Sequence, residues 1–177
     1  KPNAGKSTLL NTLLGQDLSI VTHKAQTTRH RIRGVVSQPD YQLVFSDTPG
    51  IITPGYQLHQ RMMTFVQSAF ADADVVLLVY DALGNDMDAE KFKTLLPGDK
   101  KLVVALNKID LSNQEELENI VQKIEQQLNP DAIVPISAKE KFGGDVLIKT
   151  LLQFIPEAPP YFDKDTLTDR NERFFAA

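Results

Sequence analysis

The opening of the chain constrains its fold more than any other stretch. Its first eight residues read Lys-Pro-Asn-Ala-Gly-Lys-Ser-Thr and match the phosphate-binding pattern G-x-x-x-x-G-K-[ST] from its four free positions onward. A tight loop can aim backbone N–H groups at a polyphosphate only where side chains stay out of the way, as at Gly5. Lys6 places a cation on the β- and γ-phosphates, and the Ser7 hydroxyl is a ligand for Mg²⁺. We therefore expect a bound nucleoside triphosphate to contact Asn3, Ala4, Gly5, Lys6, Ser7 and Thr8.

A helix is predicted directly after this loop, over residues 6–14, with Gly15 as the residue that ends it. The positive N-terminal end of that helix would face the same phosphates. A chance glycine before an ordinary amphipathic helix is the alternative interpretation of this stretch taken alone. A loop of this class normally follows a buried parallel strand, whereas the printed sequence begins at Lys1. We therefore expect the natural polypeptide to start at least one strand upstream.

Two further stretches supply candidate metal and switch residues. Residues 32–36 and 41–46 are predicted to form a hairpin, and the second strand runs into Asp47-Thr48-Pro49-Gly50. Asp47 would hold Mg²⁺ through water, and the Gly50 N–H would bind the γ-phosphate. In the polar, basic loop over residues 16–34, Thr28 (or Thr27) would offer a hydroxyl to Mg²⁺ and an N–H to the γ-phosphate. Each stretch alone is a weak signal. The first can equally be an ordinary solvated, basic loop, and the second an ordinary turn at the end of a strand.

The sequence Asn107-Lys108-Ile109-Asp110 is suited to the recognition of guanine. A carboxylate at Asp110 can accept hydrogen bonds from the ring N1–H and the exocyclic amine together. Adenine does not offer that pair, so Asp110 disfavours an adenylate-specific ATPase. Asn107 would reach the O6/N7 side of the base, and the stem of Lys108 would cover its face. A site of this kind rejects an analogue that lacks the bonded groups by as much as ~10⁴-fold. Backbone N–H groups of Ser137, Ala138 and Lys139 would support the base.

Apolar runs predict the architecture. Residues 75–80, 102–106 and 132–136 are predicted to be buried strands, and residues 58–71, 88–96, 114–128 and 145–155 are predicted to be helices. This alternation predicts an α/β fold with a mostly parallel sheet covered by helices on both faces. We expect one nucleotide-binding domain over residues 1–156, followed over 157–177 by a linker toward a further domain. Lys6, Asp47 and Asp110 should then meet at one rim of the sheet.

The composition and charge of the chain argue against several structural and functional classes. The chain has no cysteine, which excludes disulfides and thiolate metal sites. Its longest uninterrupted apolar run, residues 75–80, is far shorter than the ~20 residues of a membrane-spanning helix. A net charge of −4 argues against this segment alone being a strong nucleic-acid binder, since such binding depends on a basic surface.

The ordered motifs resemble those of the translation-factor-like GTPases of the P-loop class. Within that class, residues 24–29 (Lys-Ala-Gln-Thr-Thr-Arg) and the tail over residues 159–177 resemble the Era family of ribosome-assembly GTPases. The resemblance implies a P-loop NTPase fold of the Ras-like class (a G domain). It also implies that the protein binds GTP and GDP, hydrolyses GTP with Mg²⁺ as cofactor, and carries catalytic roles on Lys6, Thr28 and Gly50. The motifs are shared with relatives such as Der and TrmE. The alternative is therefore a nucleotide-dependent binding module of that kind, in which hydrolysis is incidental.

The resemblance also implies partners. Members of the family associate with the small (30S) ribosomal subunit and with the 3′ end of its 16S rRNA, and they assist its maturation. They do so through a KH-type RNA-binding domain, which this sequence does not include. The implied protein is a cytoplasmic monomer that visits the inner membrane surface as a peripheral protein.

One substitution bears on the mechanism of hydrolysis. Ras-type enzymes carry a water-orienting glutamine directly after D-x-x-G, whereas this chain has Ile51 there, and an alkyl chain cannot orient water. Asn3 resembles the loop asparagine that coordinates K⁺ in several relatives with the same substitution. The hypothesis is that K⁺ at Asn3 supplies the positive charge that an arginine finger otherwise provides. The alternative role for Asn3 is a local hydrogen bond that braces the loop.

Overall fold

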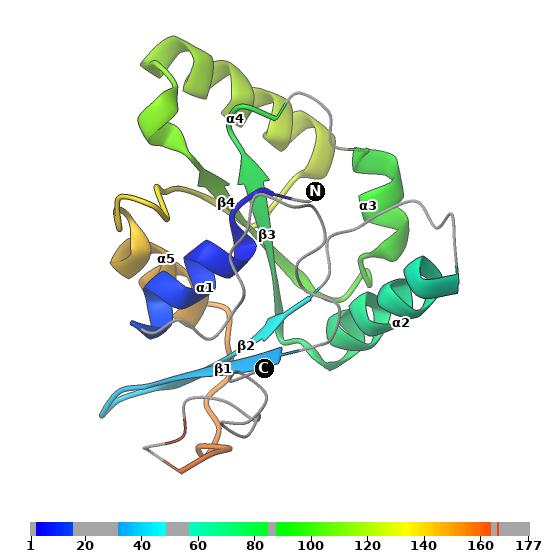
Figure 1. The fold of residues 1–177 in the computed structure, drawn as a ribbon, viewed down its shortest axis with the longest axis vertical. Coiled ribbons are helices and arrows are strands. Elements are labelled where there is room, and N and C mark those ends of the chain that lie inside the picture. The colour runs from blue at the N-terminus through cyan, green and yellow to red at the C-terminus, as the bar shows by residue number, and fades with distance from the viewer. Residues whose placement is uncertain (1–2, 16–31, 49–56, 85–87, 164–165, 167–177) are drawn as a thin grey trace.

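The structure is a computed structural model that describes residues 3–15, 32–48, 57–84, 88–163 and 166 of the 177-residue chain. It alternates helices and strands as the apolar runs predict (Figure 1). The elements are α1 (Lys6–Leu14), β1 (Ile32–Ser37), β2 (Gln42–Asp47), α2 (Gln57–Asp72), β3 (Val75–Asp81), α3 (Ala89–Leu95), β4 (Lys101–Asn107), the 3₁₀ turn η1 (Ile109–Leu111), α4 (Gln114–Leu128), β5 (Ala132–Pro135) and α5 (Gly144–Leu152).

The centre of the molecule is a parallel sheet in the order β3-β4-β5. Strand β4 lies between its two neighbours, and its residues 102–107 are all buried. Because successive side chains of a strand point to opposite faces, β4 contributes to two cores. Leu102, Val104 and Leu106 belong to one core, and Val103 and Ala105 belong to the other.

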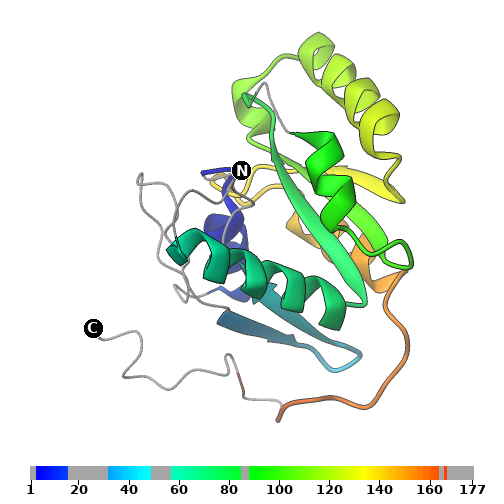
Figure 2. The same cartoon turned by 90° about the vertical axis from the view of Figure 1, so that its right-hand side faces the viewer.

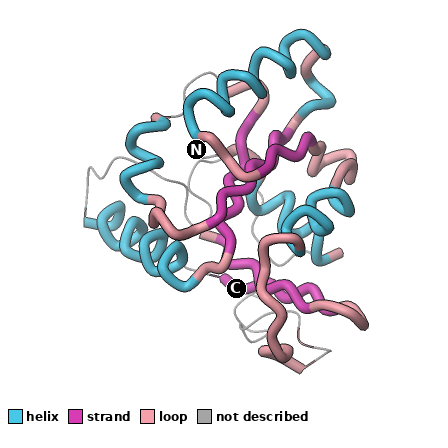
Figure 3. The backbone as a smooth tube through the Cα atoms, turned by 180° about the vertical axis from the view of Figure 1, so that it is seen from behind, coloured by secondary structure: helices cyan, strands magenta, loops and turns pink. Residues whose placement is uncertain are grey.

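Helices cover both faces of this sheet, as the sequence predicted. One core is closed by α1 and α5, through Leu9, Leu147 and Leu151. The other is closed by α3 and α4, through residues such as Phe92 and Ile124, with part of α2 packed against it. Seen from behind, the strands run through the middle of the molecule, with helices to either side (Figure 3). The arrangement confirms the predicted α/β class with a parallel sheet between two helical layers.

Strands β1 and β2 form an antiparallel hairpin apart from the parallel sheet (Figure 2). The hairpin turns at residues 38–40, where Gln38 N–H donates to the carbonyl of Tyr41 at 2.8 Å. It packs on α1 at Gly34, where an added Cβ would lie 2.6 Å from Leu14 Cδ1 and 3.1 Å from Leu10 Cδ1. A residue with a side chain at this position would therefore push the hairpin away from α1.

A groove of about 880 Å³ lies between β2 and β3. Leu9 and Leu13 of α1, Phe45 of β2 and Leu77 of β3 are among the apolar side chains that line it. Within the described residues, neither strand has a partner on the edge that faces this groove. An unpaired strand edge exposes a row of backbone donors and acceptors, so the groove offers hydrogen-bonding groups along two opposite walls.

Most helix ends follow the predicted signals, and one prediction was wrong. Gly15 and Asn129 end α1 and α4 in left-handed conformations. Helix α5, however, ends at Leu152 instead of residue 155, and Phe154 N–H then bonds the carbonyl of Leu151 in a tighter turn. Pro156 disfavours the helical conformation at Ile155, the residue directly before it, so the chain leaves the helix through this tighter turn.

No helix of the described residues is long and apolar enough to cross a membrane.

Candidate functional site

The phosphate-binding loop and the Asp47 stretch meet at a hydrogen bond. The Ser7 hydroxyl, in the first turn of α1, donates to Asp47 Oδ2 at 3.1 Å across 40 positions of sequence. Asp47 ends β2, and only 6% of its surface is exposed. A hydroxyl and a carboxylate are the oxygen ligands that Mg²⁺ prefers. The residues present therefore fit the predicted metal site.

The charge of Lys6 is held in a desolvated position beside Asp47. Burial lowers the pKa of the Lys6 ammonium below its ordinary value, and the attraction of Asp47 opposes that shift in part. A desolvated cation gains more from an arriving anion than a cation in water does, because the local dielectric constant is lower. The loop thus presents a positive charge that favours a polyphosphate.

The side chain of Asn107 connects two loops at the ends of neighbouring elements. Its Nδ2 donates to the carbonyl of Ala4 at 2.9 Å, and its Oδ1 accepts from the N–H of Ala138 at 2.9 Å. Both bonds are buried, and 3% of Asn107 is exposed. Gly5 has a φ of 91°, and a Cβ there would overlap the Asn107 amide nitrogen. The conformation and the close approach both require glycine at this position.

The loop over residues 137–143 is fixed by further bonds that the sequence did not indicate. The Thr12 hydroxyl of α1 donates to the carbonyl of Ala138 at 2.9 Å. Ser137 and Phe142 exchange both backbone hydrogen bonds, and Ser137 Oγ accepts from Glu140 N–H at 3.3 Å. A lone threonine on a helix carries no pattern that would have predicted this contact.

Lys108 is positioned by an ion pair with Asp81. Lys108 has a left-handed backbone, with φ 68°, and its Nζ lies 2.6 Å from Asp81 Oδ2. Asp81 ends β3 directly opposite Asn107 in the parallel register. Two charged residues that follow adjacent parallel strands lie at the same edge of the sheet. That signal was present in the sequence, but the prediction did not use it.

The other predicted site residues lie near the same edge or outside the description. Asp110 is exposed in η1, directly after Lys108. The side chain of Lys139 is 83% exposed and lies 3.6 Å from Glu140. Asn3 is exposed with φ 62°, and Thr8 is half-buried in α1. The switch residues Thr27, Thr28 and Gly50 and the neighbouring Ile51 lie outside the described residues, so their roles stay predictions.

The motifs therefore gather where β3 and β4 end and α1 begins. A ligand-binding crevice at the carboxyl ends of parallel strands is the general rule for open α/β sheets. In such a crevice, the amides at the start of α1, the Lys6 ammonium and the Ser7–Asp47 pair would face the phosphate end of a ligand. Asn107, Lys108 and the 137–139 loop bound the other end. The arrangement suits a nucleotide with a charged tail and a flat base.

Comparison with known proteins gives the family. The family described as "50S ribosome-binding GTPase" matches residues 1–108. GTPase Era of Bordetella avium is 45% identical over 179 residues, an alignment that covers 100% of this chain and 60% of that protein. The chain belongs to this GTPase family, in its Era group. A chloroplastic GTPase ERA1 of Zea mays is 41% identical and is covered over 43% of its length.

Solved structures agree with this assignment. A crystal structure of Era in complex with MgGDPNP and nucleotides 1506–1542 of 16S ribosomal RNA has a TM-score of 0.94 and 39% identity. That alignment covers 100% of this chain and 61% of the other. Aquifex aeolicus Era bound to GDP and AlF4⁻ gives a TM-score of 0.93 at the same identity. The chain thus spans about three fifths of the length of the bacterial Era protein and of these two solved Era chains, and 43% of the chloroplastic relative.

Replacing Asn107 by alanine should damage stability and nucleotide binding together. The change leaves the Ala4 carbonyl and the Ala138 N–H without their buried partner, at ~1–3 kcal/mol each in unfolding free energy. We expect guanine-nucleotide affinity to fall at least ~10-fold, because both loops are released. Chemical denaturation and equilibrium titration with GDP would measure the two effects.

Asn113→Ala provides the matched control. Asn113 caps α4, and its side chain accepts from Glu116 N–H, so its loss should cost ~1 kcal/mol and leave nucleotide affinity unchanged. Wild-type affinity in Asn107→Ala would contradict the role given to Asn107.

Proposed function

We propose that this chain is the nucleotide-binding domain of a GTP-hydrolysing switch protein. The observation that carries the proposal is the meeting of Ser7 with Asp47 and of Asn107 with both Ala4 and Ala138. These contacts join four separate motifs into one site. Membership of the GTPase family supports the same chemistry. GTP turnover by the protein, measured as phosphate release, tests it directly.

The phosphate half of the site is built for charge stabilisation. Lys6 contributes a desolvated ammonium next to Asp47, and the backbone amides that open α1 point toward the same place. Ser7 and Asp47 would hold Mg²⁺, which neutralises charge on the phosphates when it is bound. Thr28 and Gly50 are proposed to complete this half by binding the metal and the γ-phosphate. The crystal structure of Era with MgGDPNP supports Mg²⁺ as the cation.

The base half of the site is proposed to read guanine. Asp110 follows Lys108 on the turn η1, and Ile109 N–H bonds the carbonyl of Ile136 at 3.4 Å. This bond keeps the turn beside the loop that carries Ser137, Ala138 and Lys139. The Asp81 ion pair keeps Lys108 Nζ at one place, so that its aliphatic stem can lie along a base face.

Replacing Asp110 by asparagine should change the preferred base. The carboxamide keeps one acceptor but sets an N–H₂ group against a donor of guanine, so affinity for GTP should fall on the order of 100-fold. Xanthine carries a carbonyl in place of the exocyclic amine, so xanthosine triphosphate should bind Asp110→Asn more tightly than GTP. Competition binding with the two nucleotides measures this preference.

Asp99→Asn is the control, because Asp99 is exposed and pairs with Lys100 away from the site. An unchanged base preference in Asp110→Asn would count against guanine recognition by this residue.

A K⁺ ion at Asn3 is proposed as the positive charge that assists hydrolysis. The place of Asn3 supports this proposal, because the residue is exposed and directly precedes Ala4 and Gly5 of the phosphate-binding loop. Arginine fingers that supply such a charge are worth ~10³–10⁵ in rate.

Turnover by the intact protein should accordingly be at least ~10-fold faster in KCl than in NaCl of equal ionic strength. Asn3→Ala should remove that difference while GTP still binds. Equal rates in the two salts would rule out the potassium site and would support a loop-bracing role for Asn3.

The groove between β2 and β3 is proposed to take a parallel strand that leads into residue 1. Two facing strand edges and apolar walls suit a buried strand, and a strand parallel to β3 would end at the rim where Asn3 to Gly5 lie. The proposed domain then spans this strand and residues 1–156, and residues 157–177 form a linker.

An extension of six valine and isoleucine residues and one glycine directly before Lys1 should fill this groove. A net gain of ~2 kcal/mol in unfolding free energy would raise the melting temperature by ~4–8 °C. An extension of equal length made of lysine, proline and glycine cannot pair with either edge, and it should leave the melting temperature unchanged. Equal melting temperatures for the two extended chains would refute the strand proposal.

In the cell, the complete protein is proposed to assist assembly of the small ribosomal subunit and maturation of 16S rRNA. The Era complex with a 16S rRNA fragment supports this role, and the RNA contacts would come from a further KH domain. We propose a cytoplasmic monomer with a peripheral contact at the inner membrane. The competing role, a Der- or TrmE-like binding module, predicts partner affinity that depends on the bound nucleotide but not on hydrolysis. Single-turnover hydrolysis alongside partner affinity separates the two.

A further inference from the structure

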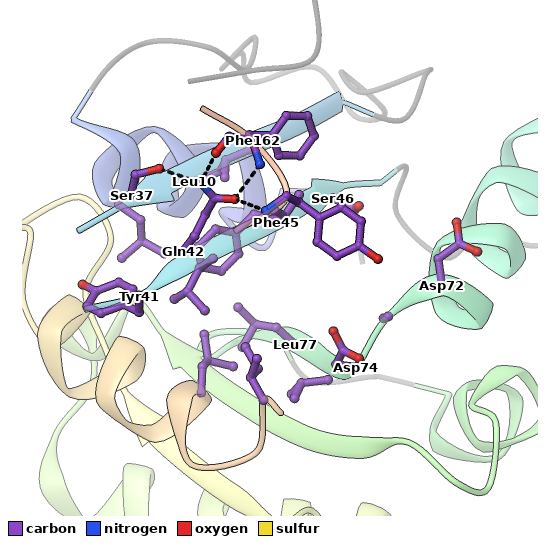
Figure 4. A pocket seen from close by; sticks show the side chains of 18 of the residues that line it. Leu10, Ser37, Tyr41, Gln42, Phe45, Ser46, Asp72, Asp74, Leu77 and Phe162 are labelled. Carbon is purple, nitrogen blue, oxygen red and sulfur yellow. Dashed lines mark hydrogen bonds between the residues drawn. The ribbon is translucent and has the colours of Figure 1, made fainter. Parts of the chain in front are cut away.

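One side chain of the hairpin binds the main chain of the segment that follows α5. Gln42, the first residue of β2, accepts hydrogen bonds at Oε1 from the N–H groups of Tyr161 and Phe162, both at 2.9 Å. Its Nε2 donates to the carbonyl of Phe162 at 2.9 Å and to Ser37 Oγ at 3.1 Å (Figure 4). A single carboxamide therefore makes three bonds to backbone groups about 120 positions away in sequence.

The geometry imitates strand pairing. In an antiparallel ladder, one residue exchanges an N–H and a C=O bond with its opposite residue. Here the Gln42 carboxamide takes the place of a backbone amide and exchanges both bonds with Phe162. Tyr161 as a whole is 87% exposed, so the contact depends on backbone groups of this residue and not on burial of its side chain.

The segment is preorganised for this contact. Pro159 and Pro160 have no N–H and favour an extended backbone, and Tyr161 and Phe162 supply the first two N–H groups after them. An extended segment loses less conformational entropy on docking than a flexible one. The segment also lines the groove between β2 and β3 (Figure 4), so docking covers part of that groove.

The same strand carries the candidate metal ligand. Gln42 and Asp47 are the two ends of β2, and β2 is paired with β1 along its whole length. A six-residue strand spans ~17 Å between its end residues, and the continuous ladder with β1 links the two ends. Any displacement of Asp47 that accompanies binding at the Ser7–Asp47 pair would therefore reach Gln42 through the strand.

We propose that Gln42 is a positioning residue that docks residues 158–162 onto β2 and thereby couples the path of the chain beyond α5 to nucleotide binding. The two states are the docked and the undocked segment. The coupling rests on the proposed function, because it takes the Ser7–Asp47 pair to be part of a nucleotide site. By linkage, nucleotide must change docking by the same factor by which docking changes nucleotide affinity.

Amide hydrogen exchange in the full chain tests the docking itself. Gln42→Leu should accelerate exchange of the Tyr161 and Phe162 amides by ~10-fold or more, because it removes their acceptor. Gln42→Glu keeps the acceptor and loses the donor to Phe162, so it should give an intermediate rate. Gln38→Leu makes the same change in the exposed turn of the same hairpin and should leave both rates unchanged. Slow exchange of the Val103 and Val104 amides in every variant verifies folding.

Three results would overturn the docking. Unchanged rates in Gln42→Leu would show that these amides find other partners. Equal acceleration by Gln38→Leu would show a general loosening of the hairpin. Protection that grows with protein concentration would mean that the segment comes from a second copy of the chain.

Hydrogen exchange with and without bound nucleotide tests whether docking is coupled to nucleotide binding. With GDP or a non-hydrolysable GTP analogue and Mg²⁺ at saturation, the protection of Tyr161 and Phe162 should change by ~5-fold or more. Gln42→Leu should shift the affinity for the same nucleotide by a matching factor, and Gln38→Leu should not. Bound nucleotide with unchanged protection would refute the coupling alone. Absence of nucleotide binding would refute the proposed function and the coupling with it, while the docking result would be unaffected.

Discussion

The buried carboxamide of Asn107 is the contact on which the site depends. It joins the loop before α1 to the loop after β5, through Ala4 and Ala138. Each of these loops comes from a different part of the sequence, and neither has a regular ladder to hold it. A buried polar network of this kind fixes one geometry when every member is bonded, and it is costly when one partner is lost. Gly5 allows the Asn107 amide to approach the first loop closely. The Thr12 hydroxyl holds the second loop through the carbonyl of Ala138.

Much of the fold could be predicted because its signals are local and repeated. The apolar runs that became β3 and β4 are too uniform for half-exposed strands, and they required helices on both faces. Glycine and asparagine marked the ends of α1 and α4, where a left-handed residue is needed. The order of the motifs predicted that Lys6, Asp47 and Asp110 meet at one rim of the sheet, because each motif adjoins the end of a predicted strand or the start of a helix.

The rest of the fold and site could not be predicted, because it depends on single contacts between residues far apart in sequence. Such contacts produce no periodic pattern in the sequence. The bonds of Thr12 to Ala138 and of Gln42 to Phe162 each rest on one polar side chain with no sequence pattern around it. The Asp81–Lys108 pair could have been found from strand order, but only by comparing the ends of both strands. The end of α5 was missed because a proline acts on the residues before it, and the apolar pattern continues past the last helical turn.

The glycine at position 34 has a consequence for the proposed Mg²⁺ site. Gly34 lets β1 rest against Leu10 and Leu14, and β1 carries β2 in a continuous ladder that ends at Asp47. The spacing between α1 and the hairpin thus affects the distance between Ser7 Oγ and Asp47 Oδ2, the two groups proposed to hold Mg²⁺. Mg²⁺ requires ligands at ~2.0–2.1 Å, whereas Ca²⁺ accepts ~2.3–2.6 Å. A bulkier residue at position 34 would therefore enlarge the space for the ion and for the water through which Asp47 is expected to hold it. That change would weaken the discrimination of the proposed site against the larger Ca²⁺.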